Sequence, residues 1–193
     1  MSGYRITVLA SGTGSLFQAL IDNQNIHNAK IVGLICDRDC PALERAAAAG
    51  IPAQVTATNS DKTSWDLDLL KTLDNYESDL IISAGFMRLI GQAVLTKYEG
   101  RIINTHPALL PNFPGAHAVR DALAAKASIT GSTIHFVDSG IDTGEIITQR
   151  QVEVFSGDTE DSLHERIKVV ERELLVKVVS DFVSGKIKTR PRS

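Results

Sequence analysis

An asparagine and a histidine two positions apart are the residues of this sequence best suited to chemistry. Asn104 and His106 open the segment NTHPALLPNFPG, residues 104–115. In a β-strand, residues two positions apart face the same side of the sheet, about 6.6 Å apart. An amide can donate a hydrogen bond to a developing oxyanion, and an imidazole can move a proton. The pair favours acyl-transfer chemistry over the alternative of a hydrogen-bonded histidine at a strand end.

The segment DSGIDTG, residues 138–144, offers a carboxylate partner for that histidine. Either Asp138 or Asp142 beside His106 would favour the protonated imidazole and fix its orientation. The segment lacks the spaced oxygen ligands of a calcium-binding loop. Because aspartate and glycine are common in turns, the segment alone favours an ordinary turn.

The segment SGTGS, residues 11–15, has the composition of an anion-binding turn. Its glycines let the backbone turn tightly, and the free N–H groups of a following helix would point at an anion. No Gly-Lys-Ser/Thr follows, and Phe17 stands where a dinucleotide fingerprint has its third glycine. A bound monophosphate is therefore favoured over a dinucleotide, with a plain helix cap and turn as an equal alternative.

The elements that must position these residues alternate along the first half of the chain. Five short apolar segments rich in β-branched residues predict buried parallel strands, and helical patterns separate them. This order predicts an open, doubly wound α/β sheet, which binds ligands at the carboxyl ends of its strands. Asn104 and His106 lie at the end of the fifth strand. The strands are expected at 5–10, 30–36, 52–55, 79–84 and 101–105, and the helices at 15–23, 41–50, 63–76 and 91–100.

The second half of the chain predicts a mixed section and a long final helix. After a helix at 118–127, apolar runs at 132–137 and 145–154 favour antiparallel or mixed strands. Thr159 then precedes acidic residues and a long amphipathic pattern, as expected for a capped helix packed on the sheet. The predicted fold class is α/β: a mostly parallel sheet with a Rossmann-like N-terminal half, a mixed C-terminal section and a long C-terminal helix.

Composition narrows the class of protein. The 193 residues are 43% apolar and 22% charged, and no apolar run reaches the roughly 20 residues of a membrane span. The N-terminal residues show no secretory signal, so we expect a cytoplasmic protein. A net charge of −3 gives no footprint for nucleic acid. Cys36 and Cys40 are expected to be reduced thiols, His27 and His164 to be solvated, and His135 to be a core histidine that borders the site.

Five blocks of the sequence resemble the phosphoribosylglycinamide formyltransferase family, in order and over nearly the whole chain. They are SGTGS, AGFMRLI at 84–90, NTHPALLPNFPG at 104–115, HFVDSGIDTGEII at 135–147 and VFSGDTEDSLHERI at 154–167. The resemblance implies a formyltransferase fold and transfer of a formyl group from the co-substrate 10-formyltetrahydrofolate to glycinamide ribonucleotide in purine biosynthesis. It implies no metal. It also implies one domain over 1–193, in which 1–100 binds the ribonucleotide phosphate and 101–193 carries catalysis and folate binding.

The resemblance assigns roles to individual residues. Asn104 and protonated His106 would stabilise the oxyanion, and Asp142 would support the imidazolium and proton movement. Glycinamide ribonucleotide would be held at its phosphate by Gly14, Ser15 and the backbone of Leu16, and at its ribose by Glu171. The expected folate-binding residues are Lys62, the backbone of Met87, Arg88, Leu89 and Ile90, then Asn104, and the loop residues Asp138, Ser139, Gly140, Ile141 and Asp142.

The sequence departs from the family pattern at several of these positions. Lys62 stands where the family usually has an arginine near the folate, and a lysine lacks the planar fork of a guanidinium. Thr13 and Leu16 replace two amide side chains of the phosphate loop. Arg172 follows Glu171 where the family usually has a histidine, and a guanidinium there suits an anion.

Three other functions stay open as alternatives. A formyltetrahydrofolate hydrolase would share the Asn, His and Asp set, but such relatives carry a further N-terminal domain and lack this phosphate loop. A methionyl-tRNA formyltransferase would need a C-terminal tRNA-binding domain. A non-catalytic folate or nucleotide-binding module would not need all three catalytic residues. The expected partners are the two small-molecule substrates, with no nucleic acid and no membrane, and a homodimer is left open.

Overall fold

A seven-stranded sheet runs through the computed structural model, which describes residues 3–56 and 61–189. The strand order is β3-β2-β1-β4-β5-β6-β7, and the first five strands of the chain pair in parallel. β6 and β7 are antiparallel to their neighbours, which confirms the mixed C-terminal section. The strands are β1 Arg5–Ala10, β2 Lys30–Cys36, β3 Ala53–Val55, β4 Leu80–Ser83, β5 Ile102–His106, β6 Ile129–Phe136 and β7 Ile146–Glu153.

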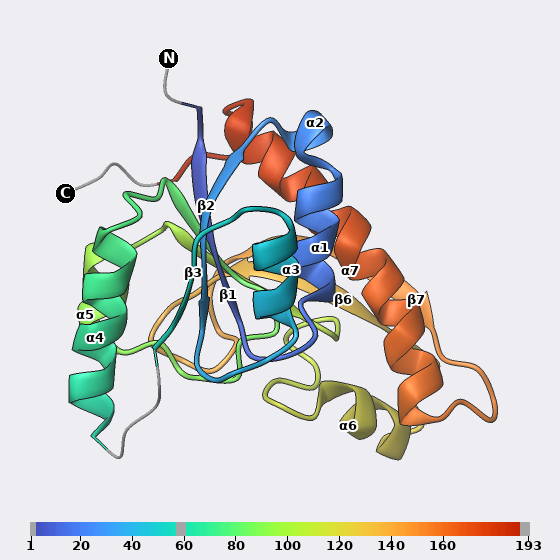
Figure 1. Cartoon of the computed structure of the whole chain (residues 1–193). Coiled ribbons are helices and arrows are strands. Elements are labelled where there is room, and N and C mark those ends of the chain that lie inside the picture. Colours follow the sequence, from blue (N-terminus) through green and yellow to red (C-terminus); the bar gives the residue numbers. More distant parts are fainter. Residues whose placement is uncertain (1–2, 57–60, 190–193) are drawn as a thin grey trace.

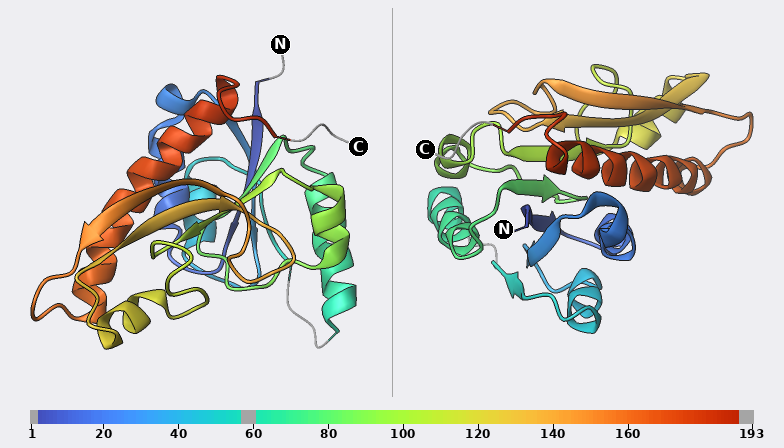
Figure 2. Two further views of the ribbon diagram at one scale, coloured as in Figure 1. Left: turned by 180° about the vertical axis from the view of Figure 1, so that it is seen from behind. Right: turned by 90° about the horizontal axis from the view of Figure 1, so that it is seen from above.

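Helices cover both faces of this sheet (Figures 1 and 2). α1, α3 and α7 share one hydrophobic cluster with the sheet, and α4 and α5 share another. α6 packs beside the start of α7. The helices are α1 Ser15–Asp22, α2 Gln24–His27, α3 Ala42–Ala48, α4 Lys62–Asp74, α5 Gln92–Lys97, α6 Ala118–Ala124 and α7 Glu160–Val183.

The central strands are apolar on both faces because each face carries a helix layer. In β1, Ile6 and Val8 belong to the cluster with α1 and α7, whereas Leu9 belongs to the cluster with α4 and α5. In β4, Ile81 and Ile82 divide between the two clusters in the same way. Each such side chain contributes about 1.5–3 kcal/mol by leaving water. The alternation explains the nearly continuous apolar runs in the sequence.

The long helix α7 begins at the expected cap. The Thr159 hydroxyl accepts a hydrogen bond from Ser162 N at 3.1 Å, and the Ser162 hydroxyl accepts one from Thr159 N at 3.0 Å. This capping box satisfies two backbone donors that the first turn leaves unpaired. Glu160 and Asp161 lie in that turn, where the positive end of the helix dipole stabilises their negative charges.

The expectation of a solvated His27 is wrong. The short helix α2, which the sequence pattern did not predict, ends at His27, and that residue is only 1% exposed. Nε2 donates to the Leu20 carbonyl at 2.8 Å, and Nδ1 accepts from Ala29 N at 3.0 Å. Polar neighbours in QNIHNAK hid this, because the ring is paired with backbone groups rather than with apolar side chains. His164 is half-buried.

Acid is expected to weaken the fold through His27. Burial lowers its pKa from the ordinary value of 6.5, so its contribution to stability is complete above pH 6.5 and is lost as the pH falls below it. The free energy of unfolding should fall by up to about 1.4 kcal/mol per pH unit for this one group. Urea unfolding between pH 7 and 5 measures this, and His27→Gln should flatten the slope. Equal slopes in both proteins would contradict the assignment.

Candidate active site

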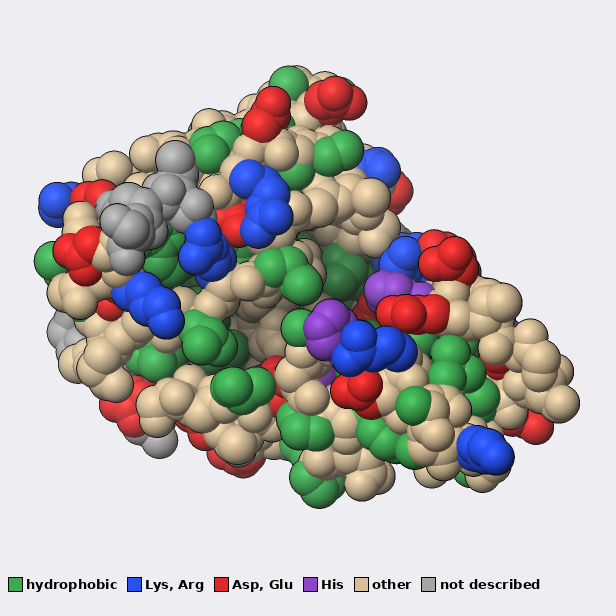
Figure 3. Space-filling view, turned by 90° about the horizontal axis from the view of Figure 1, so that it is seen from below, with side chains coloured by type: hydrophobic (Ala, Val, Ile, Leu, Met, Phe, Trp, Pro, Cys, Tyr) green, Lys and Arg blue, Asp and Glu red, His purple; other side chains and the backbone are tan. Residues whose placement is uncertain are grey.

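Asn104 and His106 project from the carboxyl end of β5, as the sequence predicts. In the register with β6, Asn104 lies opposite His135 and His106 lies opposite Thr133. Opposed residues of an antiparallel pair have side chains on the same face, so all four belong to one face of the sheet. His106 is only 3% exposed. The parallel strands end on the side seen in Figure 3, which is hollowed and has histidine and acidic side chains at one side of the hollow.

The loop after β5 is held against the neighbouring strands. Thr133 donates through its hydroxyl to the Ala108 carbonyl at 2.6 Å and accepts from Leu110 N at 3.1 Å. Gln149 on β7 donates to the Leu110 carbonyl at 2.8 Å. These contacts hold the part of the loop that precedes Phe113. Phe113 has a φ of +54°, and its carbonyl oxygen lies 2.8 Å from His106 Nε2.

The carboxylate of Asp142 completes the group. Its Oδ2 lies 3.3 Å from His106 Nδ1, and its Oδ1 lies 3.4 Å from Asn104 Nδ2. Oδ2 also accepts from Gly115 N at 2.7 Å. A hydrogen bond with His135 and the one from Gly115 lower the pKa of Asp142 to about 2, against the opposing effect of burial. The carboxylate is therefore ionised at neutral pH, and the structure brings the three expected catalytic side chains together.

The loop that carries Asp142 is a turn with an internal scaffold. Asp138 Oδ1 accepts from Gly140 N at 3.0 Å and from the Thr143 hydroxyl at 2.7 Å. A Cβ on Gly144 would lie 1.7 Å from the Phe136 carbonyl oxygen, so only glycine fits there. The aspartates thus have separate roles in the resting structure: Asp138 holds the turn and Asp142 faces the histidine.

The surroundings of His106 favour a neutral ring, whereas the resemblance implies a protonated imidazole. Both ring nitrogens face acceptors, the Phe113 carbonyl and the Asp142 carboxylate. Burial nevertheless lowers the pKa of His106 below its ordinary value, and the charge of Asp142 opposes this only in part. The neutral ring carries its hydrogen on Nε2, where the carbonyl accepts it. Nδ1 is then free to take up a proton next to a carboxylate.

His135 belongs to this site more closely than the sequence indicated. Its Nδ1 lies 2.8 Å from the Phe136 carbonyl, so Nδ1 carries a hydrogen. Its Nε2 lies 3.2 Å from Asn104 Nδ2 and 3.5 Å from Asp142 Oδ1, so the ring contacts both the amide and the carboxylate. The only signal for this role was its position in an apolar strand near the site, because the pairing register with β5 is not visible in the sequence.

The SGTGS segment forms the turn between β1 and α1. Gly14 adopts a left-handed conformation with φ of +69°, and a Cβ there would lie 2.8 Å from Ala42 Cβ. No side chain caps α1. Within the described ranges, no hydrogen bond engages the backbone N–H of Ser15 or Leu16. The helix start therefore presents unpaired donors, as an anion site requires.

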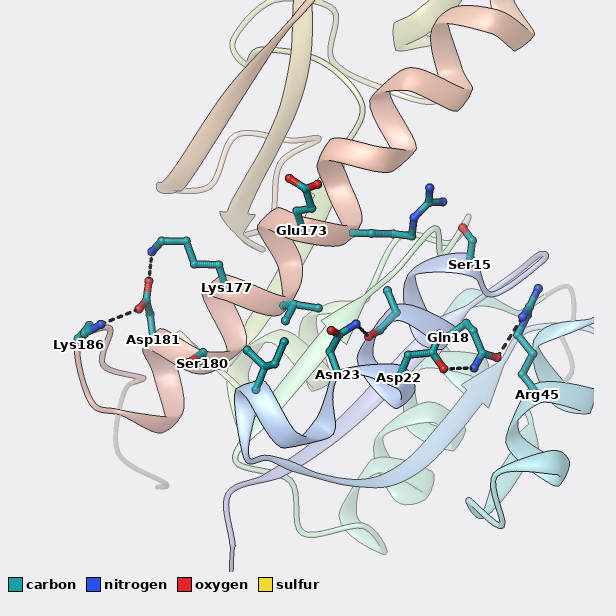
Figure 4. A pocket seen from close by; sticks show the side chains of 14 residues that line it. Ser15, Gln18, Asp22, Asn23, Arg45, Glu173, Lys177, Ser180, Asp181 and Lys186 are labelled. Carbon is teal, nitrogen blue, oxygen red and sulfur yellow. Dashed lines mark hydrogen bonds and ion pairs between the residues drawn. The ribbon is translucent and has the colours of Figure 1, made fainter.

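A cavity of about 830 Å³ lies between α1, α2 and α7, with Ser15 at one end (Figure 4). Arg45 and Arg172 also line it. Arg45 donates to the Thr13 carbonyl at 2.7 Å and to Gln18 Oε1 at 3.0 Å, so α3 supports the turn. Asn104, His106 and Asp142 are not part of its lining. The cavity thus extends from the phosphate loop along α7, away from those three side chains.

Glu171 is buried on α7 with 4% exposure. Burial raises its pKa to about 7, against the charges of Lys168 and Arg172. In the part of the chain that the structure describes, no hydrogen bond reaches its carboxyl group. Such a group gains when a ligand hydroxyl pairs with it.

The segment 84–90 combines unpaired backbone groups with exposed apolar side chains. Met87 N donates to the Ser11 hydroxyl at 2.9 Å, whereas the backbone groups of Arg88, Leu89 and Ile90 make no hydrogen bond among the described residues. The Met87 and Leu89 side chains are 62% and 70% exposed. The segment therefore offers free donors and acceptors beside an apolar surface.

The other expected folate-binding residues lie in two places. Lys62 is exposed at the start of α4 and makes no ion pair within the described ranges. Asp138 and Ser139 border a cavity of about 530 Å³ beside α5, and Ile141 is 57% exposed. Among the described residues, no hydrogen bond or ion pair joins Lys62 to the loop at 138–142.

The described residues include neither a candidate metal cluster nor a helix that could span a membrane. They contain no group of three or more His, Cys, Asp or Glu side chains placed to hold a metal ion. None of the helices among them is long and apolar enough to cross a bilayer.

Comparison with known proteins shows the family to which this chain belongs. A phosphoribosylglycinamide formyltransferase of Mycobacterium tuberculosis (strain H37Rv) is 48% identical over 179 residues, 91% of this chain and 83% of the relative. The enzyme of that name from Escherichia coli (strain K12) is 36% identical, covering 95% of this chain and 89% of its own. The crystal structure of glycinamide ribonucleotide transformylase 1 from Symbiobacterium toebii matches with a TM-score of 0.91 at 38% identity, covering 98% of this chain and 92% of that one. Residues 4–179 match the formyl transferase family model, and the chain belongs to this family.

Proposed function

We propose that this protein transfers the formyl group of 10-formyltetrahydrofolate to the amine of glycinamide ribonucleotide in purine biosynthesis. The products are formylglycinamide ribonucleotide and tetrahydrofolate. The observation that carries the proposal is the ionised Asp142 carboxylate within 3.5 Å of both Asn104 and His106, at the carboxyl edge of the sheet. Membership of the formyl transferase family and the names of the relatives supply the substrate class.

The ribonucleotide is proposed to bind with its phosphate at the start of α1. The unpaired N–H groups of Ser15 and Leu16, next to left-handed Gly14, suit a phosphate, and Arg172 adds positive charge on the same cavity. Glu171 is proposed to accept hydrogen bonds from the ribose hydroxyls. This pairing would offset the cost of its burial.

The folate is proposed to bind along segment 84–90 and the loop at 138–142. The free backbone groups of Arg88, Leu89 and Ile90 would read the donors and acceptors of the pterin edge, since the sheet fixes their positions. Exposed Met87 and Ile141 would pack on the ring. Lys62 would meet the acidic tail of the folate as a point charge.

The chemistry follows from the proton positions. The substrate amine attacks the formyl carbon, a C–N bond forms, and the formyl oxygen becomes an oxyanion. Asn104 would turn the amide hydrogen held only weakly by Asp142, at 3.4 Å, toward this oxygen. His106 Nδ1 would take the proton lost by the amine and return it to the folate nitrogen as that C–N bond breaks. Asp142 would stabilise the imidazolium formed between these steps.

The proposal also covers the domain organisation, the location and the binding partners of the enzyme. We propose one formyltransferase domain over 1–193, a cytoplasmic location, catalysis without a metal, and contacts with small molecules rather than nucleic acid or membrane. Sedimentation equilibrium at micromolar concentration would distinguish a monomer from the homodimer that the sequence leaves open.

The acceptor distinguishes transfer from hydrolysis. Release of tetrahydrofolate from 10-formyltetrahydrofolate should require glycinamide ribonucleotide, because the turn at Gly14 and the two arginines that line the cavity, Arg45 and Arg172, suit a phosphate. A spectrophotometric assay of folate product with and without the ribonucleotide measures this. Equal release in its absence would identify water as the acceptor and favour the hydrolase.

Removing the charge of Asp142 is expected to separate catalysis from folding. Asp142→Asn should lower kcat by about 10²–10⁴-fold, the usual contribution of general acid–base catalysis. The acid limb of the pH–rate profile should also move to lower pH, because Asp142 no longer raises the pKa of His106. Initial rates from pH 5 to 8 measure both effects. Asp68→Asn on the exposed side of α4 is the matched control, and an unchanged profile in Asp142→Asn would remove the proposed pair.

A further inference from the structure

Ser11, the first residue of the phosphate loop, also contacts the segment proposed to bind folate. It is 9% exposed, and its backbone N–H donates to the Gly85 carbonyl at 3.2 Å. Its hydroxyl oxygen accepts from Met87 N at 2.9 Å. One small residue thus makes a backbone and a side-chain bond to segment 84–90 while its own chain continues directly into Gly12–Ser15.

The direction of the Ser11 hydroxyl is fixed by a buried acid. Asp37 follows β2, is 2% exposed and accepts the Ser11 hydroxyl hydrogen. Arg38 pairs with the same carboxylate at 2.7 Å, and Arg88 Nε lies 3.6 Å from it. Burial opposes ionisation, but the hydrogen bonds from Arg38 and Ser11 outweigh it and lower the pKa of Asp37. The hydroxyl therefore gives its hydrogen to Asp37 and its lone pair to Met87.

Segment 84–90 has no other anchor of this kind near its middle. At its far end, Asp66 accepts from Gly91 N and Ala93 N, each at 2.9 Å. Between Gly85 and Gly91, the bond from Met87 N to Ser11 is the one backbone hydrogen bond among the described residues. The bond to Ser11 is therefore the backbone anchor next to the free groups of Arg88, Leu89 and Ile90, while the Arg88 side chain contacts Asp37 and Trp65.

We propose that Ser11 is a positioning residue that couples the two substrate subsites, so that a phosphate bound at Gly14–Leu16 strengthens folate binding at Met87–Ile90. The proposal rests on the proposed function. A phosphate held by the turn fixes the backbone that follows Ser11, and the hydroxyl passes this constraint to Met87. Coupling between binding sites is reciprocal, so folate must strengthen ribonucleotide binding by the same factor.

Trp65 supplies a reporter for the test. It is the single tryptophan, it stacks on Phe86 with ring centroids 6.2 Å apart, and Arg88 Cζ lies 5.9 Å from its ring. Tetrahydrofolate and glycinamide ribonucleotide together contain no formyl donor, so both bind without turnover. Titration of Trp65 fluorescence gives the Kd of tetrahydrofolate with and without saturating ribonucleotide.

The wild-type protein should bind tetrahydrofolate at least about 5-fold more tightly when the ribonucleotide is present, within the usual range of coupling. Ser11→Ala should reduce this factor to below about 2-fold and raise the KM for 10-formyltetrahydrofolate, with kcat changed by less than about 2-fold. Asp37→Ala should also lose the coupling, whereas Asp37→Asn keeps an acceptor for the hydroxyl and should retain it.

Ser78→Ala is the matched control, because it removes a buried serine hydroxyl that pairs with Thr7, outside segment 84–90. It should leave the coupling factor unchanged even where it lowers Tm. A wild-type factor of 1, or a full factor in Ser11→Ala, overturns the coupling while turnover with both substrates keeps the proposed function. Wild-type protein that neither binds nor uses the ribonucleotide overturns both.

Discussion

An ionised carboxylate in a largely buried position is the constraint on which the rest of this structure depends. Asp142 keeps its charge because a backbone N–H from Gly115 and the side chains of His135 and His106 surround it. An unpaired charge there would be costly, so every partner must be in place at once. The loops at 107–115 and 138–144 therefore have to be fixed by the sheet.

The antiparallel pair of β5 and β6 does this fixing. Its register puts His135 opposite Asn104 and Thr133 opposite His106, and Thr133 then holds the loop that brings Phe113 to the imidazole. A slip of one residue would turn each of these side chains to the other face. The change from parallel to antiparallel pairing at β5 is thus the point at which the fold creates the site.

The two proposed substrate subsites both consist of unpaired backbone groups on a backbone that other residues hold in place. The turn at Gly14 and the segment 84–90 leave backbone groups unpaired. Arg45, which also lines the cavity, holds the turn, and Asp66 holds the far end of the segment. Free donors and acceptors on a fixed backbone lose little entropy when a ligand binds. Ser11 stands between the two and gives the proposed coupling a physical route.

The sequence by itself determined the strands and the helices other than α2, the parallel N-terminal half and the mixed C-terminal section, because hydrophobic periodicity and the cap at Thr159 are local properties. It also placed Asn104 and His106 at a carboxyl edge and, through ordered motifs, indicated Asp142. Only the tertiary structure decided the buried state of His27, the contact of His135 with Asn104, and the lowered pKa of His106. Those properties depend on strand register and on burial by distant segments, and neither is encoded in the residues beside them.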